Sequence, residues 1–196
     1  MENNIRLKCI SITEGNIEEM VAFTVKKEGG YLGDYLAYKD KSGVIFSPAL
    51  EDEAENLSKT YLIVDDVTNE LAGYFSIKTG FVAINHGRFF RRNEFDAIPG
   101  IELANFATND AYRQAHPNYK NVGHMIFVDY ILPKVYEVQK LVGVKILYLF
   151  ALPRESLIER YTLYGFSKLS VFQQRNMHRR FKPSYDRGCI FMYQLL

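Results

Sequence analysis

The sequence has only two cysteines among its 196 residues, Cys9 and Cys189, one near each end. They form no CxxC pair and no Cys/His ligand pattern, so a zinc site or a disulfide framework is not indicated. We expect two buried thiols outside any disulfide, and no bound metal. The first 16 residues lack the basic-then-apolar layout of a secretory signal, and no run approaches the roughly 18 apolar residues that a membrane span needs. A soluble cytoplasmic protein without a membrane partner is therefore expected.

The sequence also has no marked excess of either charge, because its 24 Lys and Arg residues are balanced by 23 Asp and Glu residues, for a formal net charge of +1. Bulk charge thus gives no argument for a nucleic-acid or membrane partner, although it leaves local patches open. An apolar share of 47%, with 14 Tyr and 14 Phe, supplies a core and excludes a disordered or collagen-like protein. The length fits one domain spanning residues 1–196 without requiring a second.

Apolar periodicity predicts the first elements of the chain. Alternating residues predict a strand over residues 5–12. A helical period follows, which begins after a cap at Thr13 or Asn16 and is stopped by Gly29-Gly30. We therefore expect strand one and helix one here.

The next segments are less uniform. Residues 31–58 have a poor pattern broken by glycine and proline, so we expect an irregular region with an acidic helical piece over 50–57. This region could wrap over a site. Residues 61–77 then predict the clearest hairpin of the sequence, with turn chemistry between its two β-rich arms.

The stretch 117–133, PNYKNVGHMIFVDYILP, changes abruptly from polar sequence to an apolar run with helical spacing. It predicts a helix over about 123–141 with a loop in front of it. The first turn of a helix has unpartnered N–H groups and the positive end of the dipole, so it can seat a phosphate. Gly123 would allow close approach and Lys120 would add charge. Taken locally, an ordinary turn is the favoured explanation of the glycine.

The elements around this helix complete the order. We expect a strand over 101–108, a loop over 109–118, a buried strand over 144–152, a helix over 154–164 with Pro153 in its first turn and Gly165 at its end, and two final strands over 166–176 and 189–196 that pair as neighbours. Residues 80–99 carry a basic and aromatic cluster whose structure the pattern does not define. The result is a mixed α/β order without internal repeats.

This order resembles the GNAT superfamily of acyl-CoA-dependent N-acyltransferases, and three motifs carry the resemblance. The hairpin YLIVDDVTNELAGYFSI is similar to the second and third strands of that superfamily, with Gly73 in the second arm. IELANFAT followed by KNVGHM is similar to the fourth strand and the [QR]-x-x-G-x-[GA] pyrophosphate loop. LPRESLIERYTLYGF is similar to the end of the fifth strand and a helix ending Y-x-x-x-G-F, matched by Tyr161, Gly165 and Phe166.

The resemblance implies a GNAT-like fold of about seven mostly antiparallel strands with a parallel central pair, flanked by helices. It also implies transfer of an acetyl group from acetyl-CoA to a primary amine of a small molecule or peptide, by direct attack through a tetrahedral intermediate. The sequence departs from the pattern at Lys120, where Gln or Arg is usual, and at Met125, where Gly or Ala is usual. The loop before Lys120 is longer than common, and Arg154 stands where Asn is usual.

The resemblance assigns roles to residues of this chain. Tyr161 would protonate the departing thiolate, since a phenol with a reference pKa of about 10 carries its proton at neutral pH. Glu102 would act as the base through water; a solvent-facing strand glutamate is the equal alternative. The expected cofactor-binding residues are Phe106, Ala107, Thr108, Lys120, Asn121, Val122, Gly123, His124, Met125, Arg154 and Ser156. For Tyr161, the alternative is an ordinary aromatic packed on the sheet.

Two other functions stay open. A non-catalytic GNAT-like module could bind acyl-CoA as a regulator, and the unusual Met125 is the feature that supports this alternative. One branch of the superfamily acetylates charged tRNA as a toxin and needs a basic face. The residues for such a face are Arg88, Arg91, Arg92, Arg175, His178, Arg179, Arg180 and Lys182, although a solvated surface is favoured over a nucleic-acid partner. A homodimer through the apolar last strand is also consistent with the sequence.

Overall fold

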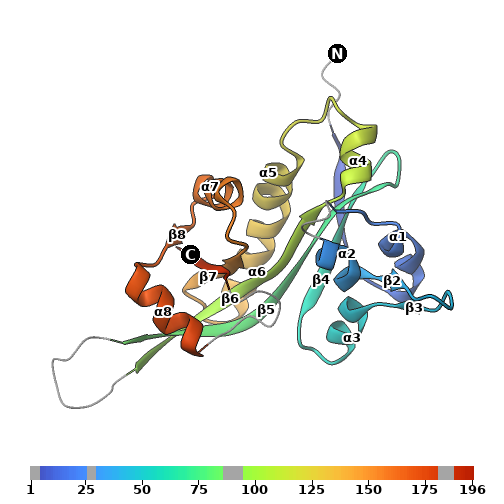
Figure 1. The fold of residues 1–196 in the computed structure, drawn as a ribbon. Coiled ribbons are helices and arrows are strands. Elements are labelled where there is room, and N and C mark those ends of the chain that lie inside the picture. The colour runs from blue at the N-terminus through green and yellow to red at the C-terminus, as the bar shows by residue number, and fades with distance from the viewer. Residues whose placement is uncertain (1–4, 26–29, 86–94, 181–187) are drawn as a thin grey trace. The chain divides into compact units, whose positions relative to one another are not determined.

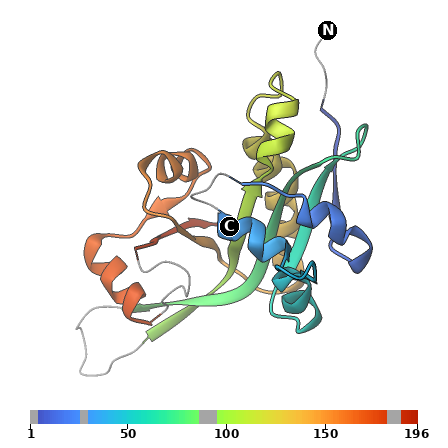
Figure 2. The same ribbon diagram turned by 45° about the vertical axis from the view of Figure 1, so that its right-hand side comes forward.

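The computed structural model describes residues 5–25, 30–85, 95–180 and 188–196. Its main sheet has seven strands in the order β1-β4-β5-β6-β7-β9-β8, and one pair of them, β6 and β7, is parallel (Figures 1 and 2). The strands are β1 (Leu7–Ser11), β4 (Lys59–Asp65), β5 (Leu71–Asn85), β6 (Phe95–Thr108), β7 (Ile146–Ala151), β8 (Ser167–Lys168) and β9 (Ile190–Leu195). The predicted mixed sheet with a parallel pair is therefore confirmed.

Helices flank this sheet, and a second, two-stranded sheet consists of β2 (Tyr38–Lys39) and β3 (Ile45–Phe46). The helices are η1 (Glu14–Asn16), α1 (Ile17–Val21), α2 (Gly30–Leu36), α3 (Pro48–Ala54), α4 (Asp110–Ala115), α5 (Val122–Ile126), the π-helical turn η3 (Phe127–Ile131), α6 (Leu132–Leu141), α7 (Glu155–Leu163) and α8 (Val171–Arg180). Within the described ranges, no helix is long and apolar enough to cross a membrane.

The chain divides into two compact units, and β5 and β6 run through both. Unit 1 contains residues 1–78 and 105–133, and unit 2 contains residues 79–104 and 134–196. In unit 1, β1 pairs antiparallel with β4, and β4 pairs antiparallel with β5. The predicted hairpin over 61–77 is thus confirmed, because local turn chemistry and two β-rich arms lie next to each other in the chain.

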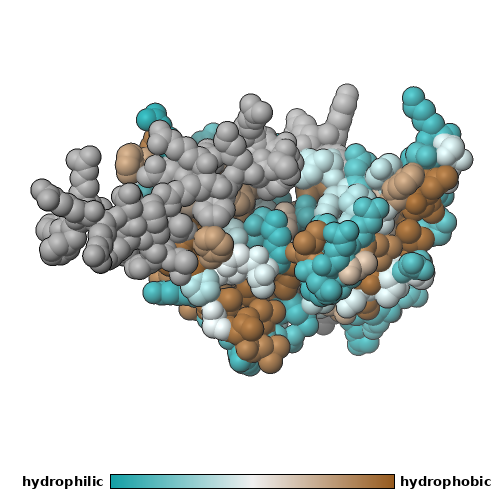
Figure 3. Space-filling model, turned by 90° about the horizontal axis from the view of Figure 1, so that it is seen from below, coloured by the Kyte–Doolittle hydropathy of each residue, from teal (hydrophilic) through white to brown (hydrophobic). Residues whose placement is uncertain are grey.

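The core of unit 1 is built on one face of this hairpin. Leu62, Val64 and Tyr74 are buried there against Met20 of α1 and Leu36 of α2. On the outside, β2 and β3 expose an aromatic pair, Tyr38 and Phe46, whose rings stack with centroids 5.5 Å apart. On the face drawn in Figure 3, brown apolar residues are interspersed with teal and white polar ones.

The first helix is shorter than predicted, because α1 ends at Val21 rather than at Gly29-Gly30. The backbone then straightens, and Thr24 is held by Asn109, whose Oδ1 accepts from the Thr24 hydroxyl at 3.0 Å. Gly30 begins α2 instead of only ending a helix, so the region 31–58 is more regular than predicted. The acidic helical piece exists, shifted to Pro48–Ala54 behind the Ser47 cap.

The predicted loop over 109–118 is wrong in its first part, which forms α4. Asn109 caps this helix, since its Oδ1 accepts from the backbone N–H of Ala111 at 3.1 Å, while its Nδ2 donates to the Leu71 carbonyl at 2.7 Å. Tyr112 is the buried residue of α4. A six-residue helix with one buried residue has no period that a sequence pattern can detect.

Unit 2 pairs β7 antiparallel with β9, and β9 antiparallel with β8. The predicted strand over 166–176 is wrong beyond Lys168, because α8 begins at Val171. Ser170 and Gln173 form a capping pair at the start of α8, with the Ser170 hydroxyl donating to Gln173 Oε1 at 2.9 Å. The last strand exists as predicted. It lies between β7 and β8, and the two-residue β8 pairs with it only at Tyr193 and Met192, so a dimer through this strand stays a prediction.

Two smaller expectations also change. Pro153 lies before α7 rather than in its first turn, because Arg154 is the N-cap and the helix begins at Glu155. Cys189 is buried, whereas Cys9 is only half-buried. The predicted helix over 123–141 is confirmed as the run from Val122 to Leu141, with a π-helical turn in its middle.

Candidate active site

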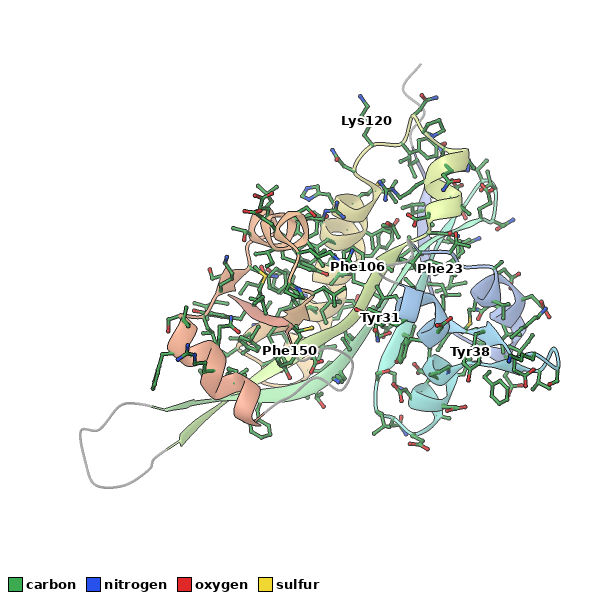
Figure 4. All side chains as sticks on the ribbon, in the orientation of Figure 1. Phe23, Tyr31, Tyr38, Phe106, Lys120 and Phe150 are labelled. Atoms are coloured by element: carbon green, nitrogen blue, oxygen red, sulfur yellow. The ribbon has the colours of Figure 1, made fainter. Side chains whose placement is uncertain are left out.

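The start of α5 is the candidate phosphate seat, and it lies in unit 1. Asn121, the N-cap, has φ of +60° and turns the chain in the left-handed region, so the residue that takes the unusual conformation is Asn121 rather than Gly123. The helical hydrogen bonds begin with Met125, whose N–H donates to the Asn121 carbonyl at 3.0 Å. Lys120 is exposed and extends away from α5 (Figure 4). Backbone N–H groups of the first turn therefore remain for an anion.

Gly73 of β5 sets how closely α5 packs on the sheet. A Cβ built on Gly73 would lie 2.7 Å from Ile126 Cδ1 and 2.8 Å from the carbonyl oxygen of Ala107. Only glycine leaves this space, since real Cβ atoms do not approach so closely. In unit 1, Ile126 at the end of α5 and the end of β6 at Ala107 and Thr108 thereby pack against the same glycine.

The end of β6 carries the three residues expected to face the acyl group. Ala107 is buried, whereas Phe106 and Thr108 are half-buried. The strand ends where the Asn109 N–H donates to the Ala72 carbonyl at 2.9 Å, directly before the Asn109 cap of α4. Partial exposure at 106 and 108 leaves this segment accessible to a ligand.

In unit 2, the parallel register of β6 with β7 runs from Gly100↔Ile146 to Glu102↔Tyr148 and ends there. β7 continues beyond that point, paired with β9 as far as Ala151. Glu102 thus lies at the last register position of the parallel pair, opposite Tyr148.

Glu102 has a specific partner in Tyr148 of β7. The Tyr148 hydroxyl donates a hydrogen bond to the Glu102 carboxylate, and Tyr148 is only 5% exposed. Burial raises the pKa of Tyr148 well above its ordinary value, and the charge and hydrogen bond of Glu102 raise it further. The sequence reading missed Tyr148. The sequence does contain a signal for it, which is a tyrosine in the middle of an otherwise apolar, buried strand. A buried tyrosine hydroxyl needs a hydrogen-bond partner.

Tyr161 lies on α7 in unit 2 and is 9% exposed. Its ring packs edge-on against Phe166, with centroids 5.7 Å apart. The Phe166 N–H donates to the Tyr161 carbonyl at 3.0 Å, and Gly165 has φ of +92°. This is the glycine-based helix ending that the Y-x-x-x-G-F spacing predicts, and it fixes the last turn of α7 around Tyr161.

The other residues predicted on this helix lie at its beginning. Arg154 is the N-cap and is half-buried, whereas Ser156 is exposed in the first turn. Of the predicted basic face, Arg175 is exposed on α8, and His178, Arg179 and Arg180 follow on the same helix. Arg88, Arg91, Arg92 and Lys182 lie outside the described residues.

No protein-family model matches the sequence. Solved structures match its fold along most of its length. A tyrosine-to-phenylalanine variant of KacT matches with a TM-score of 0.63 and 16% identity, covering 97% of this chain and 95% of that one. A Tyr-to-Phe variant of the toxin AtaT, bound to acetyl-CoA and the C-terminus of the antitoxin AtaR, matches with a TM-score of 0.58 and 15% identity, covering 94% and 91%.

A third match is AtaT complexed with acetyl-methionyl-tRNAfMet, with a TM-score of 0.60 and 14% identity, covering 95% of this chain and 94% of that one. At these identities the likeness establishes the fold. The chain has the GNAT-like fold, a mixed seven-stranded sheet with one parallel pair flanked by helices, as the sequence motifs predict.

Proposed function

We propose that this protein is an acyl-CoA-dependent N-acetyltransferase that transfers the acetyl group of acetyl-CoA to a primary amine. The observation that carries the proposal is the fold match over 94% of the chain to a toxin with acetyl-CoA bound. The local geometry supports it, because Gly73 lets α5 pack closely, through Ile126, on the end of β6, and the two segments would share a ligand with a pyrophosphate and a thioester.

The reaction requires that acetyl-CoA be bound, that the tetrahedral oxyanion be stabilised and that protons be transferred, and we assign each task to named groups. The pyrophosphate of acetyl-CoA would be held by the first-turn N–H groups of α5, with Lys120 and Asn121 at their edge. Backbone N–H groups from Phe106 to Thr108 would polarise the thioester carbonyl and stabilise the tetrahedral oxyanion. No metal is required for this chemistry.

Proton transfer falls to two side chains of unit 2. Glu102 would take a proton from the acceptor ammonium, through water, so that the amine can attack the thioester carbon. When the C–S bond breaks, Tyr161 would give its phenolic proton to the sulfur. We assign anion binding to backbone N–H groups, so the proposed arrangement does not depend on a small side chain at Met125, which is half-buried.

The acceptor is proposed as the amino group of a charged tRNA. The support is the AtaT complex with acetyl-methionyl-tRNAfMet, whose fold this chain matches over 95% of its length. The exposed Arg175 on α8, with the basic residues that follow it, supplies positive charge of the kind that phosphate contacts need. This function also implies a role as a toxin.

The experiment measures release of free thiol from acetyl-CoA against a panel of small amines, peptides and charged tRNAs. We expect turnover with charged tRNA, and a loss in kcat of about 100-fold or more for Tyr161→Phe, since a positioned acid contributes that much. Tyr136→Phe is the matched control, because Tyr136 is an exposed tyrosine on α6.

Tight acetyl-CoA binding without turnover on any amine would instead support a non-catalytic regulatory module. The toxin role has its own test, in which expression in bacteria should arrest growth and Tyr161→Phe should abolish the arrest. Uninhibited growth with intact soluble protein would overturn the toxin role, and failure to bind acetyl-CoA would overturn the entire proposal.

A further inference from the structure

The Tyr148 side chain extends across the sheet of unit 2 and packs against two glycines, Gly100 and Gly80. A Cβ built on Gly100 of β6 would lie 3.1 Å from Cδ1 of the Tyr148 ring, and one built on Gly80 of β5 would lie 3.1 Å from Cζ and overlap the hydroxyl oxygen. The ring therefore starts on β7, passes over β6 and ends at β5, since these strands are neighbours in that order. Glycine at position 80 is required for the hydroxyl to reach its position, and Gly100 leaves room for the ring as well as for Ile146, whose Cγ1 would lie 2.7 Å from a Cβ there.

Among the described residues, the neighbours of this ring that form its cluster are apolar, and Glu102 is its hydrogen-bonding partner. Val82, Ile146, Met177 of α8 and Phe191 of β9 pack with Tyr148 in one buried cluster. The Phe191 ring lies 5.4 Å from that of Tyr148, centroid to centroid. A buried phenol without a hydrogen bond would be costly, so the bond to the Glu102 carboxylate is what makes a tyrosine acceptable here. Packing alone would be satisfied by phenylalanine.

The hydrogen bond also constrains the carboxylate. Glu102 is half-buried and lies at the last register pair of β6 and β7, directly opposite Tyr148. A glutamate has three rotatable side-chain bonds, and a rigid donor at the adjacent position restricts them. Because Tyr148 stays protonated around neutral pH, it remains a donor throughout and does not exchange its proton with the reaction.

We propose that Tyr148 is a positioning residue for Glu102, held in place by Gly80 and Gly100, and that it orients the carboxylate that accepts the proton of the acceptor ammonium. This role rests on the proposed acetyltransferase function. In the step, an N–H bond of the ammonium breaks, an O–H bond forms on the Glu102 carboxyl through the intervening water, and Tyr148 keeps its own proton. Glu102 later returns the proton to solvent.

The test removes the hydrogen bond in two independent ways. Tyr148→Phe deletes the hydroxyl, and Gly80→Ala places a methyl group where the hydroxyl lies. Each should lower kcat by about 10- to 100-fold, since misplacing a catalytic group by about 1 Å can cost that much, while KM for acetyl-CoA stays unchanged. Gly143→Ala is the matched control, because nothing lies within 4 Å of a Cβ built there.

A double variant that combines Tyr148→Phe with Gly80→Ala distinguishes a positioning role from a general packing defect. In Tyr148→Phe the atom that Gly80→Ala would displace is gone, so the two losses in kcat should not multiply. Losses that multiply, or a raised KM for acetyl-CoA with unchanged kcat, would overturn the positioning role. Circular dichroism and thermal unfolding identify any variant that fails to fold. If either Gly80→Ala or Tyr148→Phe does not fold, the other single variant still tests the role.

A readout independent of turnover completes the design. In protein labelled with [13Cζ]-tyrosine, the signal that Tyr148→Phe removes belongs to Tyr148, and Glu102→Gln should shift it. An unshifted signal would overturn the role. Wild-type protein without turnover on any amine would overturn the proposed function and this role with it. Normal turnover in Tyr148→Phe, with wild type active, would overturn this role alone.

Discussion

Replacing Tyr112 by phenylalanine tests the network that joins α4 to the hairpin of unit 1. The Tyr112 hydroxyl donates to Asp65 Oδ2 at 2.6 Å, and both residues are 2% exposed. The other carboxylate oxygen, Oδ1, accepts from the N–H groups of Val67 at 2.8 Å and Thr68 at 3.2 Å. The substitution removes one of three donors and leaves the ring in place against His116, 4.5 Å away between centroids.

The magnitude follows from the charge of the acceptor. A hydrogen bond to an ionised group contributes about 1.5 to 3 kcal/mol, and a buried acceptor that loses it is not resolvated. Two remaining donors limit the loss, so we expect the free energy of unfolding to fall by about 2 kcal/mol. For a chain of this size that corresponds to a decrease in Tm of about 4 to 8 °C.

The stabilisation by the Tyr112–Asp65 hydrogen bond should depend on pH, because it requires an ionised Asp65. Burial raises the pKa of Asp65, but the hydrogen bonds from Tyr112, Val67 and Thr68 outweigh it and hold the pKa below its ordinary value. A lowered folded pKa contributes stability above the unfolded pKa of about 3.9, and this contribution is lost as pH falls through the folded value. The difference between wild type and Tyr112→Phe should therefore be constant from pH 7 to about pH 5 and shrink in more acid solution.

Urea unfolding followed by fluorescence and circular dichroism measures this difference. Tyr38→Phe is the control, because Tyr38 is a 39% exposed tyrosine of the same unit, and its loss of a hydroxyl should change stability by less than about 0.5 kcal/mol. A Tyr112→Phe protein as stable as wild type at pH 7 would refute the reasoning that Asp65 depends on the phenol.

Two further predictions concern other parts of the chain. Gly165→Ala should destabilise the end of α7 by about 1 kcal/mol or more, because Gly165 has φ of +92° and a Cβ there would lie 3.1 Å from Gln194 Oε1; thermal unfolding measures it, and an unchanged Tm would contradict it. The His116 ring hydrogen-bonds to Glu70 at 2.6 Å, which lowers the pKa of Glu70. Stability from this pair should be present above the unfolded pKa of Glu70, about 4.3, and be lost as pH falls below it, so Glu70→Gln and wild type should converge in stability towards pH 3. A gap that persists there would contradict the assignment.

The elements that the sequence predicted correctly have local causes. The hairpin needs only two β-rich arms and a turn, with Asn69 in the left-handed region at φ of +59°. The long helical run after Asn121 shows its period over five turns. The end of α7 is set by Gly165 within four residues of Tyr161. Each of these can be read without knowing where the remainder of the chain lies.

The elements that were missed depend on distant partners or on a single capping residue. α1 ends early because Thr24 is bound by Asn109, 85 residues away, and α4 begins there because the same Asn109 caps it. α8 was readable in principle, since Ser170 and Gln173 make a capping box, but the apolar Val171 and Phe172 suggested a strand. Both of these apolar residues are exposed in the helix.

The sequence by itself therefore determined the order of strands and helices, the class of fold and the candidate residues at helix and strand ends, because periodicity, capping and glycine-based turns act within a few residues. Only the tertiary structure decided which groups meet. In the folded chain, Tyr148 of β7 passes over Gly100 of β6 and reaches Gly80 of β5, and its hydroxyl donates to Glu102. That contact depends on strand order and on space left by absent side chains, and neither is written in any short stretch of sequence.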